Sequence, residues 1–216
     1  MKFSELPEIL NIPPKLLPMI ESFNDFRYFL LEGGRGGGKT QAVARLLLFL
    51  ADRYPLRIVC GRETQNSISE SVYSVLTDLI QKHDLNFEVL ASRITSRGTG
   101  STISFRGFRE QGAFNIQGLE GIDIVWIDEG QAITKRTLDI LLPTIRKETA
   151  RIFFSMNRYL PNDPVYERFV GRSDCLHIKI DYFENPFCTE ALKKEADECA
   201  KLSPSTSRHF ILVVVL

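Results

Sequence analysis

The chain has few cysteines, no excess of charge and no long apolar run, and each absence excludes a class of protein. Its 216 residues include four cysteines without C-x-x-C spacing, so we expect neither a zinc site nor a disulfide framework, and a reducing cytosol fits better. Basic and acidic residues number 27 each, so bulk charge gives no case for nucleic-acid binding. No stretch approaches the ~20 apolar residues of a membrane span, and no signal peptide is expected.

The remaining composition is ordinary for one globular domain, with 44% hydrophobic and 25% charged residues. Apolar runs typical of strands alternate with segments of helical periodicity, which predicts an α/β fold with a mostly parallel sheet. Residues 1–22 are punctuated by prolines and predict an irregular arm. The predicted strands are 28–31, 56–60, 87–90, 102–105, 122–127, 151–155 and 175–180, and the predicted helices are 41–52, 67–83, 134–142, 165–170 and 186–202.

A glycine-rich segment between the first strand and the first helix carries the strongest signal. Its sequence, Gly33-Gly34-Arg35-Gly36-Gly37-Gly38-Lys39-Thr40, fits the phosphate-binding pattern G-x-x-x-x-G-K-[ST] at every fixed position. Backbone N–H groups converge in such a loop, and the helix that follows presents the positive end of its dipole. Lys39 is expected to reach the β- and γ-phosphates of a nucleotide, and the Thr40 hydroxyl to bind Mg²⁺.

A second motif follows the apolar strand 122–127, which ends in Asp128 and Glu129. A buried parallel strand delivers such residues to the carboxyl edge of the sheet, beside the glycine loop. Asp128 is the candidate for the Mg²⁺ shell, and Glu129 for the base that activates the attacking water. Because a phosphotransferase excludes water, the pair favours hydrolysis over a small-molecule kinase. The alternative is a strand leading into an acidic first helical turn.

Polar residues at other strand ends are further candidates. Asn157 and Arg62 each follow a strand and are expected beside the nucleotide, although an asparagine turn would explain the former equally simply. Arg35 is a candidate to stabilise the transition state within its own subunit. Arg106 and Arg109 are candidates to act on a neighbouring subunit, with a solvated surface position as the alternative.

The base of the nucleotide needs a contact surface as well. Phe23, Phe26 and Arg27 lie just before the first strand, where they are candidates to stack on it. Core packing is the equal alternative for the two phenylalanines.

Six segments together resemble the large terminase subunit of tailed bacteriophages, the ATPase motor that packages DNA. Their order and spacing agree with that family from about Phe23 to about Phe210. The segments are 33–40, 60–71, 119–129, 141–147, 155–158 and 182–186.

The resemblance implies a P-loop NTPase three-layer sandwich of the additional-strand, catalytic-glutamate type. It implies Mg²⁺-dependent ATP hydrolysis by residues 23–210, driving translocation of double-stranded viral DNA into the procapsid. In its terms, Arg35 matches the loop arginine, Lys39 and Thr40 the phosphate and Mg²⁺ residues, Asp128 and Glu129 the acidic pair, and Asn157 the coupling position.

The resemblance also implies partners and a location. These are double-stranded DNA, the portal protein, the small terminase subunit and a homo-oligomeric ring, expected to be a pentamer, in the host cell cytoplasm. Family members continue into a ribonuclease H-like nuclease domain, which the 216 residues do not include, so we expect no nuclease activity here. Residues 211–216 are expected to be a truncated tail or linker. A helicase- or recombinase-type motor, a P-loop kinase and a nucleotide-gated binding module are the alternatives.

Overall fold

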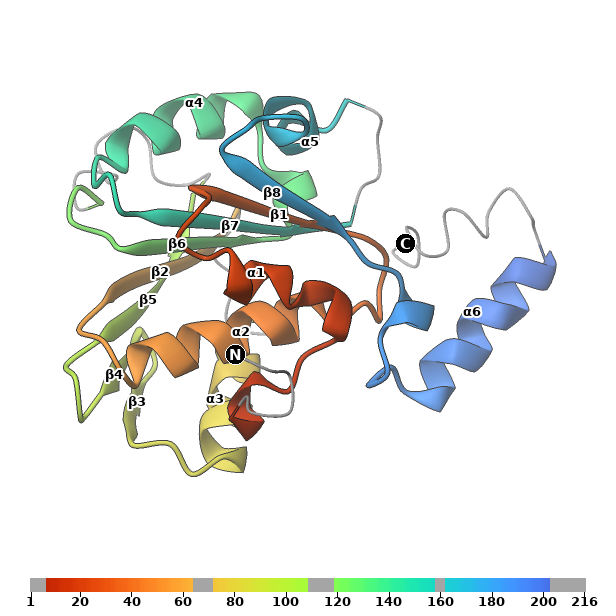
Figure 1. Cartoon of the computed structure of the whole chain (residues 1–216), viewed down its shortest axis with the longest axis horizontal. Coiled ribbons are helices and arrows are strands. Elements are labelled where there is room, and N and C mark those ends of the chain that lie inside the picture. The colour runs from red at the N-terminus through yellow and green to blue at the C-terminus, as the bar shows by residue number, and fades with distance from the viewer. Residues whose placement is uncertain (1–6, 64–71, 109–118, 158–161, 203–216) are drawn as a thin grey trace.

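The computed structural model describes residues 7–63, 72–108, 119–157 and 162–202. Within them the centre is an eight-stranded sheet in the order β3-β4-β5-β2-β6-β7-β1-β8 (Figure 1). Six strands pair in parallel, and β3 and β4 add an antiparallel hairpin at one edge. The strands are β1 Tyr28–Glu32, β2 Arg57–Arg62, β3 Phe87–Leu90, β4 Arg93–Ser96, β5 Thr102–Gly107, β6 Ile124–Asp128, β7 Arg151–Met156 and β8 Cys175–Lys179.

Helices cover both faces of this sheet. In Figure 1, α1, α2 and α3 lie below it, α4 and α5 lie above it, and α6 stands apart on the right, beyond the carboxyl ends of the strands. The helices are α1 Pro18–Glu21, α2 Lys39–Ala51, α3 Ser74–Lys82, α4 Lys135–Thr144, α5 Pro164–Phe169 and α6 Glu190–Leu202, with single 3₁₀ turns η2 Glu8–Leu10, η3 Pro14–Leu16, η5 Gly130–Ala132 and η6 Tyr182–Glu184. The arrangement confirms the predicted three-layer α/β sandwich.

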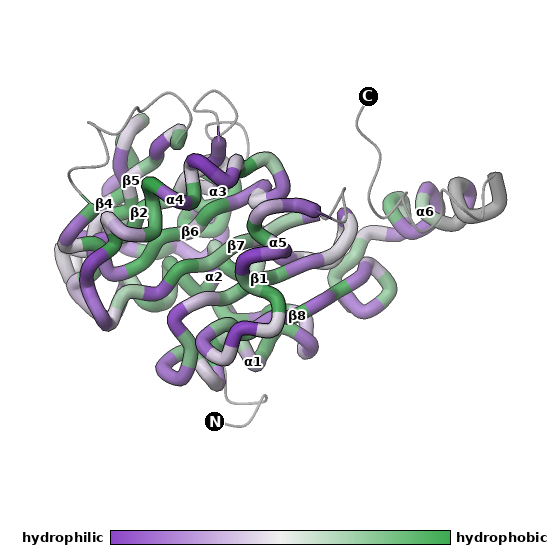
Figure 2. Tube along the Cα trace, turned by 90° about the horizontal axis from the view of Figure 1, so that it is seen from above, coloured by the Kyte–Doolittle hydropathy of each residue, from purple (hydrophilic) through white to green (hydrophobic). Residues whose placement is uncertain are grey.

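The layers follow from side-chain alternation in the central strands. Successive residues of a strand point to opposite faces, so Phe29 joins the core under α2 and α3 while Leu30 joins the core under α4 and α5. Trp126 and Phe153 belong to the first core, and Val125, the residue before Trp126, belongs to the second. Figure 2 shows the resulting band of apolar residues through the central strands. Burial on both faces explains why these strands are near-continuous apolar runs.

The strand order brings the two sequence motifs to one edge. β7 lies between β1 and β6 and is parallel to both. In the pairing register, Ser155 of β7 lies opposite Leu31 of β1 and Asp128 of β6. The loop that follows β1 and the acidic residues that end β6 therefore open onto the same carboxyl edge. The strand β7 thus lies between the two strands that lead into the motifs.

Several elements differ from the sequence-based expectation. Strand β4 was not predicted; its residues Arg93–Ser96 pair with both neighbours as a short hairpin strand. The helix predicted at 67–83 is described only from residue 72, and α3 covers Ser74–Lys82. The arm predicted at 1–22 includes residues such as Leu10 and Leu16 that are buried in the core under α2.

At its end, the chain also departs from the predicted boundaries. The helix predicted from residue 186 begins at Glu190, where the Thr189 hydroxyl accepts a hydrogen bond from the Leu192 N–H at 3.3 Å. The apolar run 210–216 and the predicted tail 211–216 lie outside the described residues.

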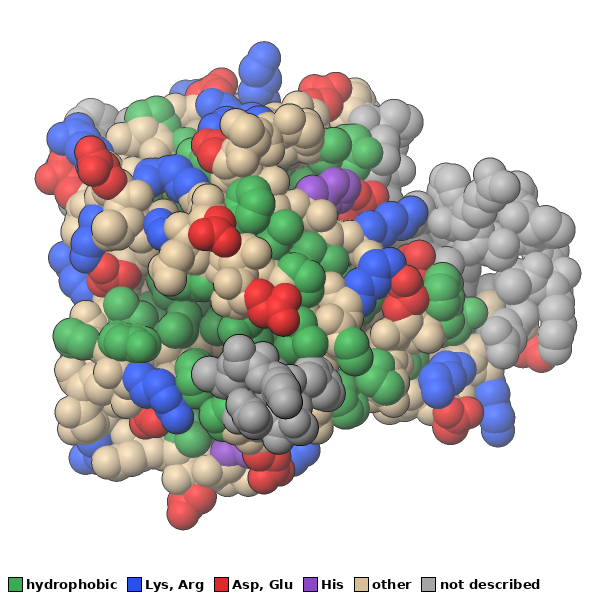
Figure 3. Space-filling view, in the orientation of Figure 1, with side chains coloured by type: hydrophobic (Ala, Val, Ile, Leu, Met, Phe, Trp, Pro, Cys, Tyr) green, Lys and Arg blue, Asp and Glu red, His purple; other side chains and the backbone are tan. Residues whose placement is uncertain are grey.

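The surface shows no segregation of charge on the face drawn in Figure 3, where acidic and basic side chains are interspersed. This distribution agrees with the formal net charge of zero. None of the helices in the described part of the chain has the length and apolar content that a membrane crossing needs.

Candidate active site

The glycine loop is shaped by close backbone contacts that only glycine allows. Gly33 has φ +146°, and a Cβ there would lie 1.8 Å from the Ile180 carbonyl oxygen after β8. Gly38 adopts φ +78° immediately before α2, a left-handed conformation that costs other residues free energy. These two positions wrap the loop around the N-terminus of α2, so that its N–H groups face the anion-binding side.

Lys39 is buried at the centre of this loop. Its Nζ donates to the carbonyl oxygens of Gly33 and Gly34 at 2.7 and 2.6 Å, and to Asn157 Oδ1 at 3.0 Å. Burial lowers the pKa of Lys39 to about 8, while the negative charges of Asp128, Asp181 and Glu32 oppose this shift. Phosphate oxygens would add negative charge beside the ammonium group and so favour its charged form.

Asp128 is the hub of a buried polar network. Its Oδ1 accepts hydrogen bonds from Thr40 at 3.2 Å and from Ser155 at 2.6 Å, and Ser155 Oγ accepts one from the Trp126 indole at 2.9 Å. The Thr40–Asp128 contact joins the glycine loop to the acidic motif. Trp126 is the single tryptophan of the chain, so its fluorescence is a built-in reporter of this network.

Arg62 supplies the counter-charge to both acidic residues. Its guanidinium donates to Asp128 Oδ2 at 2.7 and 3.3 Å, and Nη1 lies 3.2 Å from Glu129 Oε2. The side chains of Arg62 and Asp128 are 10% and 5% exposed, so this pair is shielded from water, whereas Glu129 is 47% exposed. Arg62 was predicted as a nucleotide contact, and the structure places it on the carboxylates that flank the cavity.

Replacing Arg62 with alanine is expected to lower the free energy of unfolding of the metal-free protein by about 3 kcal/mol, because breaking a buried ion pair leaves its partner uncompensated. Urea unfolding followed by Trp126 fluorescence measures this. The matched control is Arg146→Ala, whose ion pair with Glu120 is exposed and should contribute below about 1 kcal/mol. Equal stabilities of the two variants would contradict this account of Arg62.

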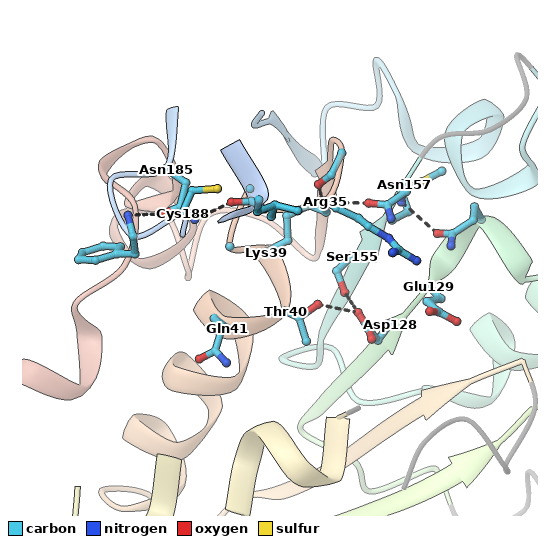
Figure 4. Close-up of a pocket in the computed structure, with 18 of the residues that line it drawn as sticks. Arg35, Lys39, Thr40, Gln41, Asp128, Glu129, Ser155, Asn157, Asn185 and Cys188 are labelled. Atoms are coloured by element: carbon cyan, nitrogen blue, oxygen red, sulfur yellow. Dashed lines mark hydrogen bonds between the residues drawn. The ribbon is translucent and has the colours of Figure 1, made fainter. Parts of the chain in front are cut away.

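Glu129 adopts an unusual backbone conformation, with φ +55° and ψ +46°. A non-glycine residue in the left-handed region costs about 1–2 kcal/mol, and such strain clusters at functional sites. The turn directs β6 into η5 and leaves the Glu129 carboxylate at the cavity. Arg35 is exposed on the loop, and its side chain extends across the cavity toward the side where Glu129 and Asn157 lie (Figure 4).

These residues surround one cavity of about 380 Å³ at the carboxyl edge of the sheet. The cavity brings together the predicted residues of the two motifs, with Arg62 and Asn157; Gly33 does not line it, but its carbonyl oxygen accepts a hydrogen bond from Lys39. Asn157 is held by its contact with Lys39, and its backbone N–H donates to Gln131 Oε1 at 3.0 Å. The predicted residues that line the cavity are Gly34, Arg35, Gly36, Gly37, Gly38, Lys39, Thr40, Arg62, Asp128, Glu129 and Asn157.

Other candidates do not reach the site. Arg106 is the penultimate residue of β5, which β2 separates from β6, and it does not line the cavity. Arg109 lies outside the described residues.

The proposed base contacts upstream of β1 were wrong. Phe23 stacks on Phe29 and Phe153 in the core, with ring centroids 6.0 and 6.2 Å apart, and Phe26 packs against Phe29. Arg27 donates to the Ile145 carbonyl oxygen at 2.7 Å. These residues precede β1, whereas the cavity lies at the opposite, carboxyl end of the strands.

The sequence reasoning missed several residues that line the cavity, and three of them are Gln131, Ser155 and Asn185. Ser155 is the polar residue near the end of an apolar strand, and Gln131 follows Glu129 by two positions. Ser155 and Asn185 lie in the segments 155–158 and 182–186 that carried the resemblance, which could have led to them, whereas Gln131 had no such signal.

The sheet order, the phosphate loop after β1 and the acidic pair after β6 define a P-loop NTPase of the additional-strand, catalytic-glutamate class. A family model for the phage terminase large subunit matches residues 25–212. The chain belongs to that family.

Relatives and solved structures agree with this assignment. The large terminase subunit of Bacillus phage SPP1 is 23% identical over 203 residues, covering 84% of this chain and 47% of that protein. The large terminase of a thermophilic bacteriophage superposes with a TM-score of 0.73 at 14% identity, over 87% of this chain and 50% of that one; that enzyme is also solved with ADP and with ATP-γ-S. The ATPase domain of a Thermus phage large terminase gives 0.62 at 16% identity, over 94% of each chain. The chain thus spans about half the length of the first two.

Proposed function

We propose that this chain hydrolyses ATP with Mg²⁺ and couples hydrolysis to translocation of double-stranded viral DNA into the procapsid. The observation that carries the hydrolytic part is the convergence of Lys39, Thr40, Asp128 and Glu129 on one cavity. Membership of the terminase family supports the packaging role. We assign the ATPase activity to residues 23–210.

The Thr40 hydroxyl and the Asp128 carboxylate fit a magnesium ion. They lie 3.2 Å apart, and the described residues contain no cluster of three or more His, Cys, Asp or Glu side chains that would form an all-protein metal cage. Mg²⁺ usually binds one or two protein oxygens together with substrate phosphates and water. When bound, the ion would neutralise charge on the phosphates, and Thr40 and Asp128 would hold it.

The other residues divide the remaining tasks. The loop N–H groups and Lys39 would hold the phosphates, and Glu129 would accept the proton of the attacking water. Arg35 would stabilise charge on the γ-phosphate. Asn157, which already contacts Lys39, would sense the loss of that phosphate and pass the change to β7 and its following segment.

The test is phosphate release from ATP by the purified chain with Mg²⁺. We expect release that stops with excess chelator. A P-loop kinase would transfer the phosphoryl group to a small acceptor with little release, and a nucleotide-gated binding module would bind ATP without turnover. Absence of release from a chain that binds ATP would contradict the proposed hydrolysis.

The family also supports specific partners for the whole motor. We propose that the chain acts with the portal protein and the small terminase subunit, in a homo-oligomeric ring, expected to be a pentamer, in the host cell cytoplasm. A helicase- or recombinase-type motor would not require a portal. Binding of this chain to purified portal rings, measured by sedimentation, separates the two roles.

A further inference from the structure

The cavity extends beyond the part that phosphates would occupy. Glu129 and Asn157 line it, and so do Phe187 and Cys188, which lie between η6 and α6, and Leu192 in the first turn of α6. Figure 4 shows Asn185, Cys188 and Gln41 on the opposite side of the loop from Asn157 and Glu129. A triphosphate gains little from contact with an aromatic ring or a leucine, whereas a nucleobase can stack on the ring and pack against the leucine.

Asn185 fixes this segment to the glycine loop. Its Nδ2 donates to the Gly36 carbonyl oxygen at 2.6 Å, and its Oδ1 accepts from the Phe187 N–H at 2.9 Å. Asn185 is buried, so both ends of its amide are committed within the protein. The residue therefore sets the position of Phe187 relative to the loop, while the Phe187 side chain itself stays 50% exposed.

We propose that Phe187 is the stacking surface for the nucleotide base, held in place by Asn185; this inference rests on the proposed nucleotide site. A phosphate loop binds the γ-phosphate on the side of the catalytic acid and holds the α- and β-phosphates in its backbone. With Glu129 at the γ end, the sugar and base leave the loop past Thr40 and Gln41. Phe187 lines the same cavity, and its chain neighbours Asn185 and Cys188 lie on the Gln41 side of the loop in Figure 4.

Stacking also predicts which bases the site prefers. Its strength depends on ring area, and it tolerates different bases. A site built on Phe187 is therefore expected to bind purines more tightly than pyrimidines.

The experiment is calorimetric titration of the full chain, with Mg²⁺, by ATP, GTP, CTP and inorganic tripolyphosphate. Phe187→Ala should raise the Kd for ATP and GTP by about tenfold or more, from the loss of one stacked base, and leave the Kd for tripolyphosphate unchanged. Phe187→Trp should restore purine binding. Phe183→Ala is the matched control, because Phe183 is 67% exposed on the preceding turn and does not line the cavity.

The ligands separate failure of the base site from failure of the nucleotide site. If Phe187→Ala binds ATP as tightly as wild type, or loses tripolyphosphate in the same proportion, Phe187 is not the stacking residue. If wild type binds CTP as tightly as ATP and GTP, the predicted preference for purines is wrong. If wild type binds neither tripolyphosphate nor ATP, the proposed nucleotide site itself is overturned.

Discussion

Replacing Glu129 with glutamine is expected to leave ATP binding intact and to lower the rate of phosphate release by about 10²–10⁴-fold, the usual contribution of a general base. Glutamine has the same shape but a neutral amide that cannot take a proton from water. The Lys39–Asn157 and Thr40–Asp128 hydrogen bonds do not involve Glu129, so the phosphate-binding groups are unchanged. Single-turnover phosphate release and calorimetric Kd values for ATP measure the two parts separately.

The matched control is Glu120→Gln, which removes an exposed carboxylate paired with Arg146 at the surface. It should leave both Kd and turnover within about twofold of wild type, since exposed pairs contribute little. Turnover near the wild-type rate in Glu129→Gln would remove Glu129 from the role of base. A large loss of ATP affinity in that variant would instead indicate that the charge of Glu129, through its ion pair with Arg62, helps to shape the binding site.

The parts of the site that the sequence predicts are those determined by local chain geometry. Gly33 and Gly38 adopt backbone conformations that other residues disfavour, and the motif records this requirement directly. Asp128 and Glu129 follow a buried strand whose end must lie at the carboxyl edge. A few consecutive residues are therefore enough to predict where each motif lies in the fold.

The parts that the sequence does not predict depend on which strands become neighbours. Arg62 meets Asp128 because β2 pairs with β6, and residues 66 positions apart thereby form a buried ion pair. Asn185 meets Gly36 because β8 lies beside β1.

Phe23 illustrates the converse, a residue close to the loop in sequence that the assembled sheet keeps away from the site. Closeness to the loop in sequence suggested a base contact, but a strand of five residues separates it from the cavity edge. No periodicity or local motif records such distances, because they arise only when the sheet is assembled.

Replacing Lys39 with alanine is expected to raise the Kd for ATP by about a hundredfold or more and to abolish measurable turnover. Each charge-assisted hydrogen bond contributes about 1.5–3 kcal/mol, and a factor of ten in Kd corresponds to about 1.4 kcal/mol, so two lost phosphate contacts suffice. The lysine is already buried, and its pKa of about 8 in the free protein reflects a charge that lacks full compensation. Phosphate oxygens supply the missing negative charge, and an alanine at this position cannot make that favourable interaction.

Two controls make the Lys39 result specific. Lys82→Ala removes an exposed lysine at the end of α3 and should change neither Kd nor turnover. Lys39→Arg keeps the charge but replaces a compact ammonium with a planar fork, which cannot donate in the same way to Gly33 and Gly34. We therefore expect it to retain part of the affinity and lose most of the turnover. An ATP affinity of Lys39→Ala within threefold of wild type would mean that the loop backbone alone holds the phosphates.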